Sequence, residues 1–191
     1  MHHVIVCGDC GERQLTKMLV SACTHYGGVV AANGGYILQT AKEPAFLLLS
    51  VNSLKALDCS GLLILGEALC QVPAAVRMKN VLSIADSTNR DAVKFLQGTG
   101  KAMIGCSMSD KDTVTLSERN ETGGLFCLQR TVTTLGGRVI DPCEIAVSAE
   151  AAVPVFPLLA ACCVLLLCDV PYQDGYDLTG KDSLEMIRVF E

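Results

Sequence analysis

Hydrophobic residues form short continuous runs along the first 110 positions of the chain. These runs cover residues 3–7, 45–51, 61–65, 80–85 and 101–106. Continuous apolar runs are typical of strands that are covered on both faces, as in a parallel sheet between layers of helices. The pattern therefore predicts an α/β fold with a mostly parallel, Rossmann-like sheet flanked by helices.

Helical spacing appears between these runs. Leu15, Met18, Leu19 and Ala22 form one apolar stripe within residues 14–26, which predicts a helix that ends before two glycines. A second helix is expected over residues 89–97. Two short strands, residues 29–32 and 36–40, are expected on either side of an Asn-Gly-Gly turn at 33–35.

The rhythm changes after residue 110. Three strand-like segments are separated by turn signals and predict an antiparallel hairpin layer. They cover residues 113–117, 124–132 and 138–147. We expect one domain over 1–191, with a parallel part at 1–110, hairpins at 111–150 and closing helices at 151–191.

Residues 151–168 carry no charge over eighteen positions, the minimum for a transmembrane helix. Pro154 and Pro157 suit the first turn of a helix better than its middle, which leaves about eleven helical residues, too few to span a bilayer. We expect a buried helix here and no membrane partner. Residues 182–190 could form a last amphipathic helix.

The composition is apolar, with 50% hydrophobic and 18% charged residues, against about 25% charged in an average soluble domain. Part of this surplus is expected at an interface with a second copy or a protein partner. The net charge is −5, and the 15 basic residues are scattered along the chain. This distribution does not indicate a basic surface for nucleic acid, so no nucleic-acid partner is expected.

The chain has 11 cysteines, most of them within apolar runs. Reduced, buried thiols in a cytoplasmic protein explain this pattern better than disulfides do, and no signal peptide is expected at the start. Cys7 and Cys10 form a C-x-x-C that suggests redox or metal chemistry. No second such pair supplies further ligands, so we expect no metal and interpret Cys7 as the end of a buried strand.

The turn after the first strand has the architecture of a phosphate-binding loop. Gly8 and Gly11 stand where such a loop places its glycines, which let backbone N–H groups approach phosphate. Glu12 stands where a lysine would neutralise the phosphate, and Arg13 where a hydroxyl would hold magnesium. The loop thus predicts a P-loop-type fold with altered chemistry.

At this point the chain resembles the central, ATP-binding domain of the Mur ligases, which join amino acids to peptidoglycan precursors. The turn at 8–11 is similar to their Gly-Thr-Asn-Gly-Lys-Thr-Thr loop. Residues 49–53 resemble their strand with a magnesium-binding glutamate, and 84–89 resemble their Asn-Ala-Asp-Asp-Pro segment. Residues 158–161 resemble their closing Asn-Ala-Leu-Ala-Ala helix.

The resemblance implies that the scaffold is kept and that charged groups are lost. By position, Ser50 replaces the magnesium glutamate and Ser87 replaces the second aspartate of the pair. The His-Asn before the last helix has no counterpart in residues 150–154. The ligases also carry an N-terminal and a C-terminal domain, for which 191 residues leave no room.

What remains is a vestigial nucleotide site. Its candidate residues are Gly8, Asp9, Cys10, Gly11, Arg13, Asp86 and Asn89. Asp86 and Asn89 could contact a ribose or base, although Asp86 could equally cap the following helix. Arg13 and Lys17 could supply positive charge to an anion on the loop, or could belong to a solvated helix face.

The leading interpretation is a stand-alone, non-catalytic relative of the Mur ligase central domain that serves as a binding or regulatory module without a cofactor. Acyl-phosphate chemistry requires neutralisation of the transferred phosphoryl group, which Glu12 would oppose. Two alternatives remain open. One is a subunit that binds ATP and magnesium in a ligase completed by partner chains, and the other is a thiol-redox protein using Cys7 and Cys10.

Overall fold

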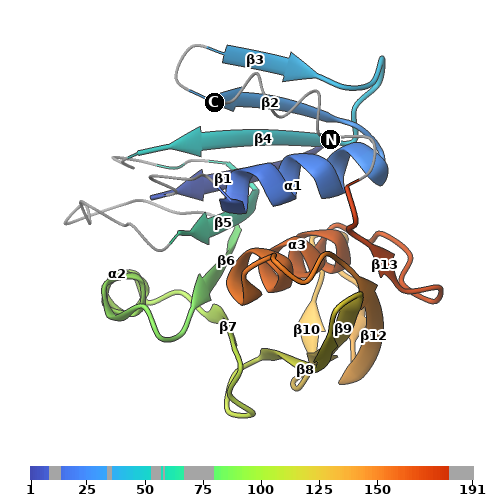
Figure 1. Cartoon of the computed structure of the whole chain (residues 1–191). Helices are drawn as coiled ribbons and strands as arrows, with labels where there is room; N and C mark the ends of the chain where they lie inside the picture. Colours follow the sequence, from blue (N-terminus) through green and yellow to red (C-terminus); the bar gives the residue numbers. More distant parts are fainter. Residues whose placement is uncertain (9–13, 34–35, 53–56, 58, 67–79, 181–191) are drawn as a thin grey trace.

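The structure is a computed structural model that describes residues 1–8, 14–33, 36–52, 57, 59–66 and 80–180. Its dominant feature is an eleven-stranded sheet in the order β13-β12-β9-β8-β7-β6-β5-β1-β4-β2-β3 (Figure 1). The first seven strands among the described residues are β1 (His2–Cys7), β2 (Val29–Asn33), β3 (Tyr36–Gln39), β4 (Phe46–Val51), β5 (Gly61–Leu65), β6 (Val81–Asp86) and β7 (Met103–Ser107). The predicted α/β fold class is confirmed.

The parallel part of the sheet changes direction around β1. From β1 the chain passes to β2, forms the antiparallel β2–β3 hairpin, and returns as β4 beside β1. It then continues on the other side of β1 with β5, β6 and β7, all parallel. In open α/β sheets, ligands bind beyond the carboxyl ends of the strands where the order reverses. That place here lies beyond β1, β4 and β5.

Helices α1 (Gln14–His25) and α3 (Val155–Leu167) pack against each other on one face of the sheet, as Figure 1 shows. The face they cover includes Val4 and Val6 of β1, which are fully buried. Helix α2 (Arg90–Thr99) packs on β6 through a second core cluster that contains Ile5 of β1. Because neighbours along a strand point to opposite faces, the continuous apolar runs serve two cores, as predicted.

The antiparallel strands continue the same sheet. They are β8 (Val114–Asn120), β9 (Gly123–Leu128) and β12 (Cys143–Ser148), followed by the short β13 (Tyr176–Asp177). β8 pairs in parallel with β7, and β9 pairs antiparallel with both β8 and β12. β10 (Val132–Thr133) and β11 (Val139–Ile140) form a separate two-stranded sheet.

The predictions of one strand over residues 124–132 and of one strand over 138–147 are wrong. The first segment divides into β9 and β10, and the second divides into β11 and β12, with Asp141 and Pro142 between them. Proline cannot donate a ladder hydrogen bond, so it ends the pairing of β11 with β10.

Helix α3 is buried over almost its whole length. Twelve of its residues are buried, and its mean character is apolar on all sides, as expected of a helix in the centre of a core. Pro154 is the N-cap and Pro157 lies in the first turn, so the predicted start of the helix is confirmed. Among the described residues, no helix is long and apolar enough to cross a membrane. The helix proposed over 182–190 lies outside the described residues.

Candidate functional site

The candidate site begins at the carboxyl ends of the three central strands. Gly8 donates a backbone hydrogen bond to the carbonyl of Val51 at 3.2 Å, and Gly66 donates one to the carbonyl of Cys7 at 2.8 Å. Gly8 has a φ of +81°, a conformation that glycine adopts without steric cost. β1, β4 and β5 are therefore joined at the point where the sheet would present a ligand.

Ser50 lies on β4 at the position that the resemblance assigns to a magnesium-binding glutamate. The Thr16 hydroxyl on α1 donates to the Ser50 hydroxyl at 3.5 Å, and Thr16 is almost fully buried. A serine hydroxyl carries no charge, and carboxylates are the usual anionic oxygen ligands of Mg²⁺. Among the described residues, Ser50 therefore makes a polar contact between β4 and α1.

Asp86 ends β6 and shapes the turn that follows. Its Oδ1 accepts hydrogen bonds from the backbone N–H of Thr88 at 2.8 Å and from the Thr88 hydroxyl at 2.7 Å. It does not cap α2, so that alternative is wrong. The side chain of Asn89 is the cap, with its Oδ1 accepting from Asp91 and Ala92 at 3.1 and 3.2 Å.

Asn89 also ties the turn to the sheet. Its Nδ2 donates to the carbonyl of Gly66 at 3.2 Å, so both the carbonyl and the amide of this side chain serve local structure. An asparagine can make four hydrogen bonds. At least three are made within the chain, which leaves little capacity for a ribose or a base.

A second polar cluster lies beyond β6 and β7. The hydroxyls of Ser87 and Ser107 both donate to Oδ2 of Asp112, the first at 2.6 Å. Asp112 also lies close to Gly105, where an added Cβ would come within 2.7 Å of its Oδ1. Sequence reasoning identified Ser87 but missed Asp112, because nothing in the spacing links residues 25 positions apart.

The remaining loop candidates fall within residues 9–13. Asp9, Cys10, Gly11, Glu12 and Arg13 lie outside the described residues. Lys17 is on α1, four positions after Arg13 in the sequence. The described residues therefore bring Gly8, Asp86 and Asn89 to one edge of the sheet, and the anion-binding role of the loop stays a prediction.

Two pockets flank this edge. A pocket of about 210 Å³ lies between α1, the segment before α3 and the segment after β13, and its lining includes Lys17, Met18, Glu150 and Leu178. A second pocket, of about 460 Å³, is lined on one side by Asp86 and on the other by Phe156 at the start of α3. Neither pocket was predicted from the sequence, since each combines segments that are distant along the chain.

Arg119 fixes one wall of the first pocket. Its guanidinium donates to the carbonyls of Ala151, at 2.8 Å, and Val153. Both residues belong to the segment that leads into α3. An arginine can hold two carbonyls at once because its donors are arranged as a rigid fork.

The cysteines within α3 and directly after it are buried in the core. Burial raises the pKa of the Cys162 and Cys168 thiols, the latter to about 12. Cys163 lies 3.7 Å from Cys106 of β7, sulfur to sulfur, and this hydrogen bond and burial raise the pKa of Cys106. Thiols held protonated are poor nucleophiles and poor metal ligands.

Cys7 is also buried, at 2% exposure, as predicted for the last residue of a strand. The nine described cysteines form no disulfide. Within the described ranges, no three His, Cys, Asp or Glu side chains gather as a metal site.

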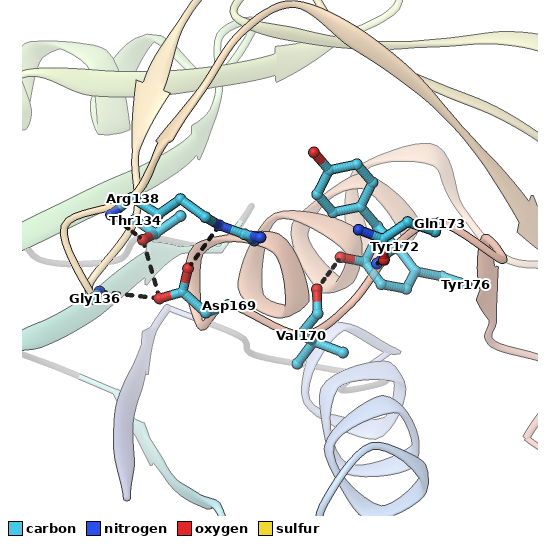
Figure 2. Close-up of polar contacts among 8 residues, drawn as sticks. All are labelled: Thr134, Gly136, Arg138, Asp169, Val170, Tyr172, Gln173 and Tyr176. Carbon is cyan, nitrogen blue, oxygen red and sulfur yellow. Dashed lines mark hydrogen bonds and ion pairs between the residues drawn. The ribbon is translucent and has the colours of Figure 1, made fainter.

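The other prominent polar cluster lies at the C-terminal end of α3 and was not predicted. Figure 2 shows the Asp169 carboxylate between the turn after β10 and Arg138. Its Oδ2 accepts from the Thr134 hydroxyl at 3.0 Å and from the backbone N–H of Gly136 at 3.1 Å, and its Oδ1 lies 3.1 Å from Arg138 Nε. We call these four residues the Asp169 clasp.

The clasp also ends the helix. Asp169 has a φ of +61°, and the N–H groups of Asp169 and Val170 donate to the carbonyls of Leu166 and Leu165. This is the Schellman pattern, in which a residue in the left-handed region closes a helix. Tyr176 donates to the carbonyl of Val170 at 3.3 Å (Figure 2), so β13 is attached to the same end.

Comparisons with known proteins place the fold. The sequence matches no family model and no curated protein. Among solved structures, the chain is similar to a MurF from Acinetobacter baumannii with a TM-score of 0.55 and 9% identity, over 91% of this chain and 44% of that one. It is also similar to the MurF ligase from Thermotoga maritima solved with ADP, with a TM-score of 0.52 and 10% identity, over 90% of this chain and 46% of that one.

The similarity extends to a bifunctional folylpolyglutamate synthase/dihydrofolate synthase from Yersinia pestis, with a TM-score of 0.52 and 10% identity. It covers 91% of this chain and 56% of that one. The resemblance to Mur ligases is thus confirmed at the level of the fold, and the chain spans less than half of the MurF structures that it matches.

Proposed function

We propose that this chain is a non-catalytic binding module built on the scaffold of a Mur ligase ATP-binding domain. The proposal rests on the contacts that polar side chains make at the carboxyl edge of the sheet. There, Ser50, Asp86 and Asn89 contact neighbouring residues of the chain itself. Side chains that serve a nucleotide or a metal need donors, acceptors or charge directed at the ligand.

The charge at this edge supports the same conclusion. A phosphoryl-transfer site neutralises phosphate with a lysine and holds magnesium with carboxylates and hydroxyls. The sequence has Glu12 at the lysine position and Ser50 at the glutamate position. A nucleotide on this loop would meet an added negative charge and would lack an anionic ligand for its metal.

The test is a calorimetric titration of the wild-type protein with ATP and with ADP, each with and without magnesium, at moderate salt. The proposal expects no heat of binding up to millimolar nucleotide. Micromolar, magnesium-dependent binding would contradict it and would favour a nucleotide-binding subunit completed by partner chains.

The nucleotide-binding alternative draws support from the 210 Å³ pocket beside the first turns of α1. A pocket there borders the helix that follows the loop, with Lys17 and Glu150 among its lining residues. Pro154→Trp would fill this pocket from its wall. If the wild type binds nucleotide, this substitution should weaken binding at least tenfold, whereas Asp174→Ala on the exposed surface should not.

The thiol-redox alternative depends on Cys7 and Cys10 forming a reversible disulfide. Cys7 is almost fully buried at the end of β1, where a thiol is slow to react. Equilibration with glutathione buffers followed by mass spectrometry of native protein should find this pair reduced. A native Cys7–Cys10 disulfide with a measurable potential would revive the alternative.

A further inference from the structure

The 210 Å³ pocket beside α1 lies between three segments that are distant in sequence. On α1, Ser21 follows Lys17 and Met18 at spacings of four and three, which place the three residues on one face of the helix. The facing walls are residues 152–154 before α3 and residues 178–180 after β13. We call this cavity the α1 pocket.

The two facing walls are held by hydrogen bonds that do not involve α1. The Arg119 guanidinium donates to two carbonyls of the segment that leads into α3. The backbone N–H of Leu178 donates to the carbonyl of Ser148 at 2.7 Å. The α1 pocket is therefore formed by the chain itself, as most small-molecule sites are.

Ser21 places a hydroxyl without a partner in the α1 pocket. Ser21 is 7% exposed, and its hydroxyl makes no hydrogen bond within the described ranges of the chain. Gly180 passes so close that an added Cβ would lie 3.1 Å from the hydroxyl oxygen. A buried hydroxyl without a partner is costly, and native proteins contain few of them. A ligand that forms a hydrogen bond with Ser21 would remove this cost.

The rest of the inner surface is mainly apolar. Met18, Val153, Pro154 and Leu178 are among its side chains, and an apolar lining with few polar groups is the usual composition of a small-molecule site. A cavity of about 150 Å³ holds benzene, which has six heavy atoms. On that scale, a pocket of about 210 Å³ holds roughly eight or nine heavy atoms.

Two charged side chains of opposite sign, Lys17 and Glu150, also line the pocket. Glu150 is exposed and Lys17 is half-buried, and ion pairs at exposed sites contribute little. A carboxylate in the pocket would meet the charge of Glu150, and an ammonium would meet that of Lys17. A zwitterion would have to lose the hydration of two charges. An uncharged head group avoids both the repulsion and this loss.

We propose that the α1 pocket binds a small uncharged alcohol or phenol, with its hydroxyl group hydrogen-bonded to Ser21 and an apolar body of about seven or eight carbon atoms. A serine hydroxyl both donates and accepts, so it pairs with another hydroxyl in either orientation. The inference rests on the proposed function and deepens it by naming the class of ligand that the module binds.

The test uses the protein labelled with ¹³C at its methionine methyl groups. The Met18 methyl resonance, assigned with Met18→Leu, reports binding at the pocket wall. Benzyl alcohol, benzylamine and benzoate share one apolar body and differ in the head group, and each is titrated to 20 mM at pH 7. Benzyl alcohol should shift the Met18 resonance with a dissociation constant of about 1 mM, since affinity is limited by the number of ligand atoms. The two charged probes should bind at least threefold more weakly.

Two variants locate the contact. Ser21→Ala should weaken the binding of benzyl alcohol about fivefold, which corresponds to one hydrogen bond between uncharged groups, and should keep the fold because alanine favours a helix. Ser60→Ala changes an exposed serine before β5 and should leave binding unchanged. Pro154→Trp should remove the shift by filling the pocket. Circular dichroism and thermal melts verify that each variant is folded, and Ser21→Ala decides alone if Pro154→Trp is not.

A Met18 resonance that does not move with 20 mM benzyl alcohol would overturn the proposal. Binding of benzylamine, benzoate or the zwitterion leucine that equals or exceeds that of benzyl alcohol would also overturn it, as would undiminished binding by Ser21→Ala. The nucleotide titration is separate from these results. Binding of magnesium-ATP contradicts the proposed function, whereas an unmoved Met18 resonance contradicts only the class of ligand.

Discussion

The C-terminal end of α3 and the carboxyl edge of the sheet use polar side chains in different ways. At the end of α3, one carboxylate connects segments more than thirty residues apart, because Asp169 binds Thr134 and Gly136. At the carboxyl edge, Asp86 and Asn89 mainly shape the turn and the helix start beside them. Charge is therefore kept where it holds the fold together.

Under the proposed function, this difference is how a scaffold of this fold keeps its stability without the ligase chemistry. The core around α3 and the Asp169 clasp connect segments that are distant in sequence from residues 9–13. The carboxyl edge needs only small polar groups that satisfy the exposed ends of strands and helices. Changes near α3 should therefore affect stability strongly, and changes at the carboxyl edge should affect it weakly.

The largest expected effect is a loss of stability at alkaline pH. Burial raises the pKa of the Cys23, Cys162 and Cys168 thiols, and the hydrogen bond with Cys163 together with burial raises that of Cys106. Unfolding restores ordinary pKa values of about 8.5. Above that pH the unfolded state loses protons that the folded state keeps, so each thiol lowers the free energy of unfolding by up to about 1.4 kcal/mol per pH unit.

Urea unfolding at pH 7, 8.5 and 9.5 measures this loss. Between pH 8.5 and 9.5 the free energy of unfolding should fall by several kcal/mol, since about four such thiols contribute up to about 1.4 kcal/mol each. Cys162→Ala should reduce the fall of the free energy of unfolding with pH by the contribution of one thiol, up to about 1.4 kcal/mol per pH unit. A free energy of unfolding that stays constant over this range would contradict the burial of these thiols.

The next largest effect is expected at the Asp169 clasp. Asp169→Ala removes an ion pair and two accepted hydrogen bonds and places alanine at a positive φ. We expect a loss of about 2–3 kcal/mol in the free energy of unfolding, in the range of hydrogen bonds to charged groups. Chemical denaturation provides the measurement.

Two variants sharpen the result at the clasp. Asp169→Asn keeps an acceptor and tolerates the left-handed conformation, so it should lose clearly less than the alanine variant. Asp174→Ala, on the exposed surface, should change the free energy of unfolding by less than about 0.5 kcal/mol. If the loss at Asp169→Ala is no larger than at Asp174→Ala, the clasp is not a structural element.

The smallest effect is expected at the carboxyl edge. Asn89→Ala removes the cap of α2 and the hydrogen bond to Gly66, and a lost cap costs about 1 kcal/mol. Asn89→Asp keeps the cap acceptor but not the donor to Gly66, so its loss should be smaller. Thermal and urea unfolding measure both variants. If either lost more free energy of unfolding than Asp169→Ala does, the carboxyl edge would matter more for stability than the clasp, contrary to expectation.

The sequence predicted the parallel part of the fold well, because its signals are local. Continuous apolar runs marked β4 and β5, and the stripe of Leu15, Met18 and Leu19 marked α1. Pro154 and Pro157 marked the start of α3. These residues act on the backbone beside them or on one face of their own element.

The parts that were missed depend on distant pairs. No local pattern links Asp112 with Ser87, or Asp169 with Thr134, since their contacts follow from the arrangement of the sheet. The strand predicted over 138–147 is interrupted in the structure because Pro142 cannot continue the ladder, which the apolar pattern alone does not show. At the site, the sequence identified which residues depart from the family's motif, but it did not show that Asp86 and Asn89 are engaged in turns.

The most direct test of the central claim compares the wild type with Glu12→Lys/Arg13→Thr/Ser50→Glu, which restores the loop lysine, the hydroxyl and the magnesium carboxylate. Both proteins are titrated with magnesium-ATP in the calorimeter under identical conditions. We expect no binding by the wild type up to millimolar nucleotide and measurable binding by the restored protein. Wild-type binding that equals that of the restored protein would contradict it, because the lost groups would then not have been what nucleotide binding requires.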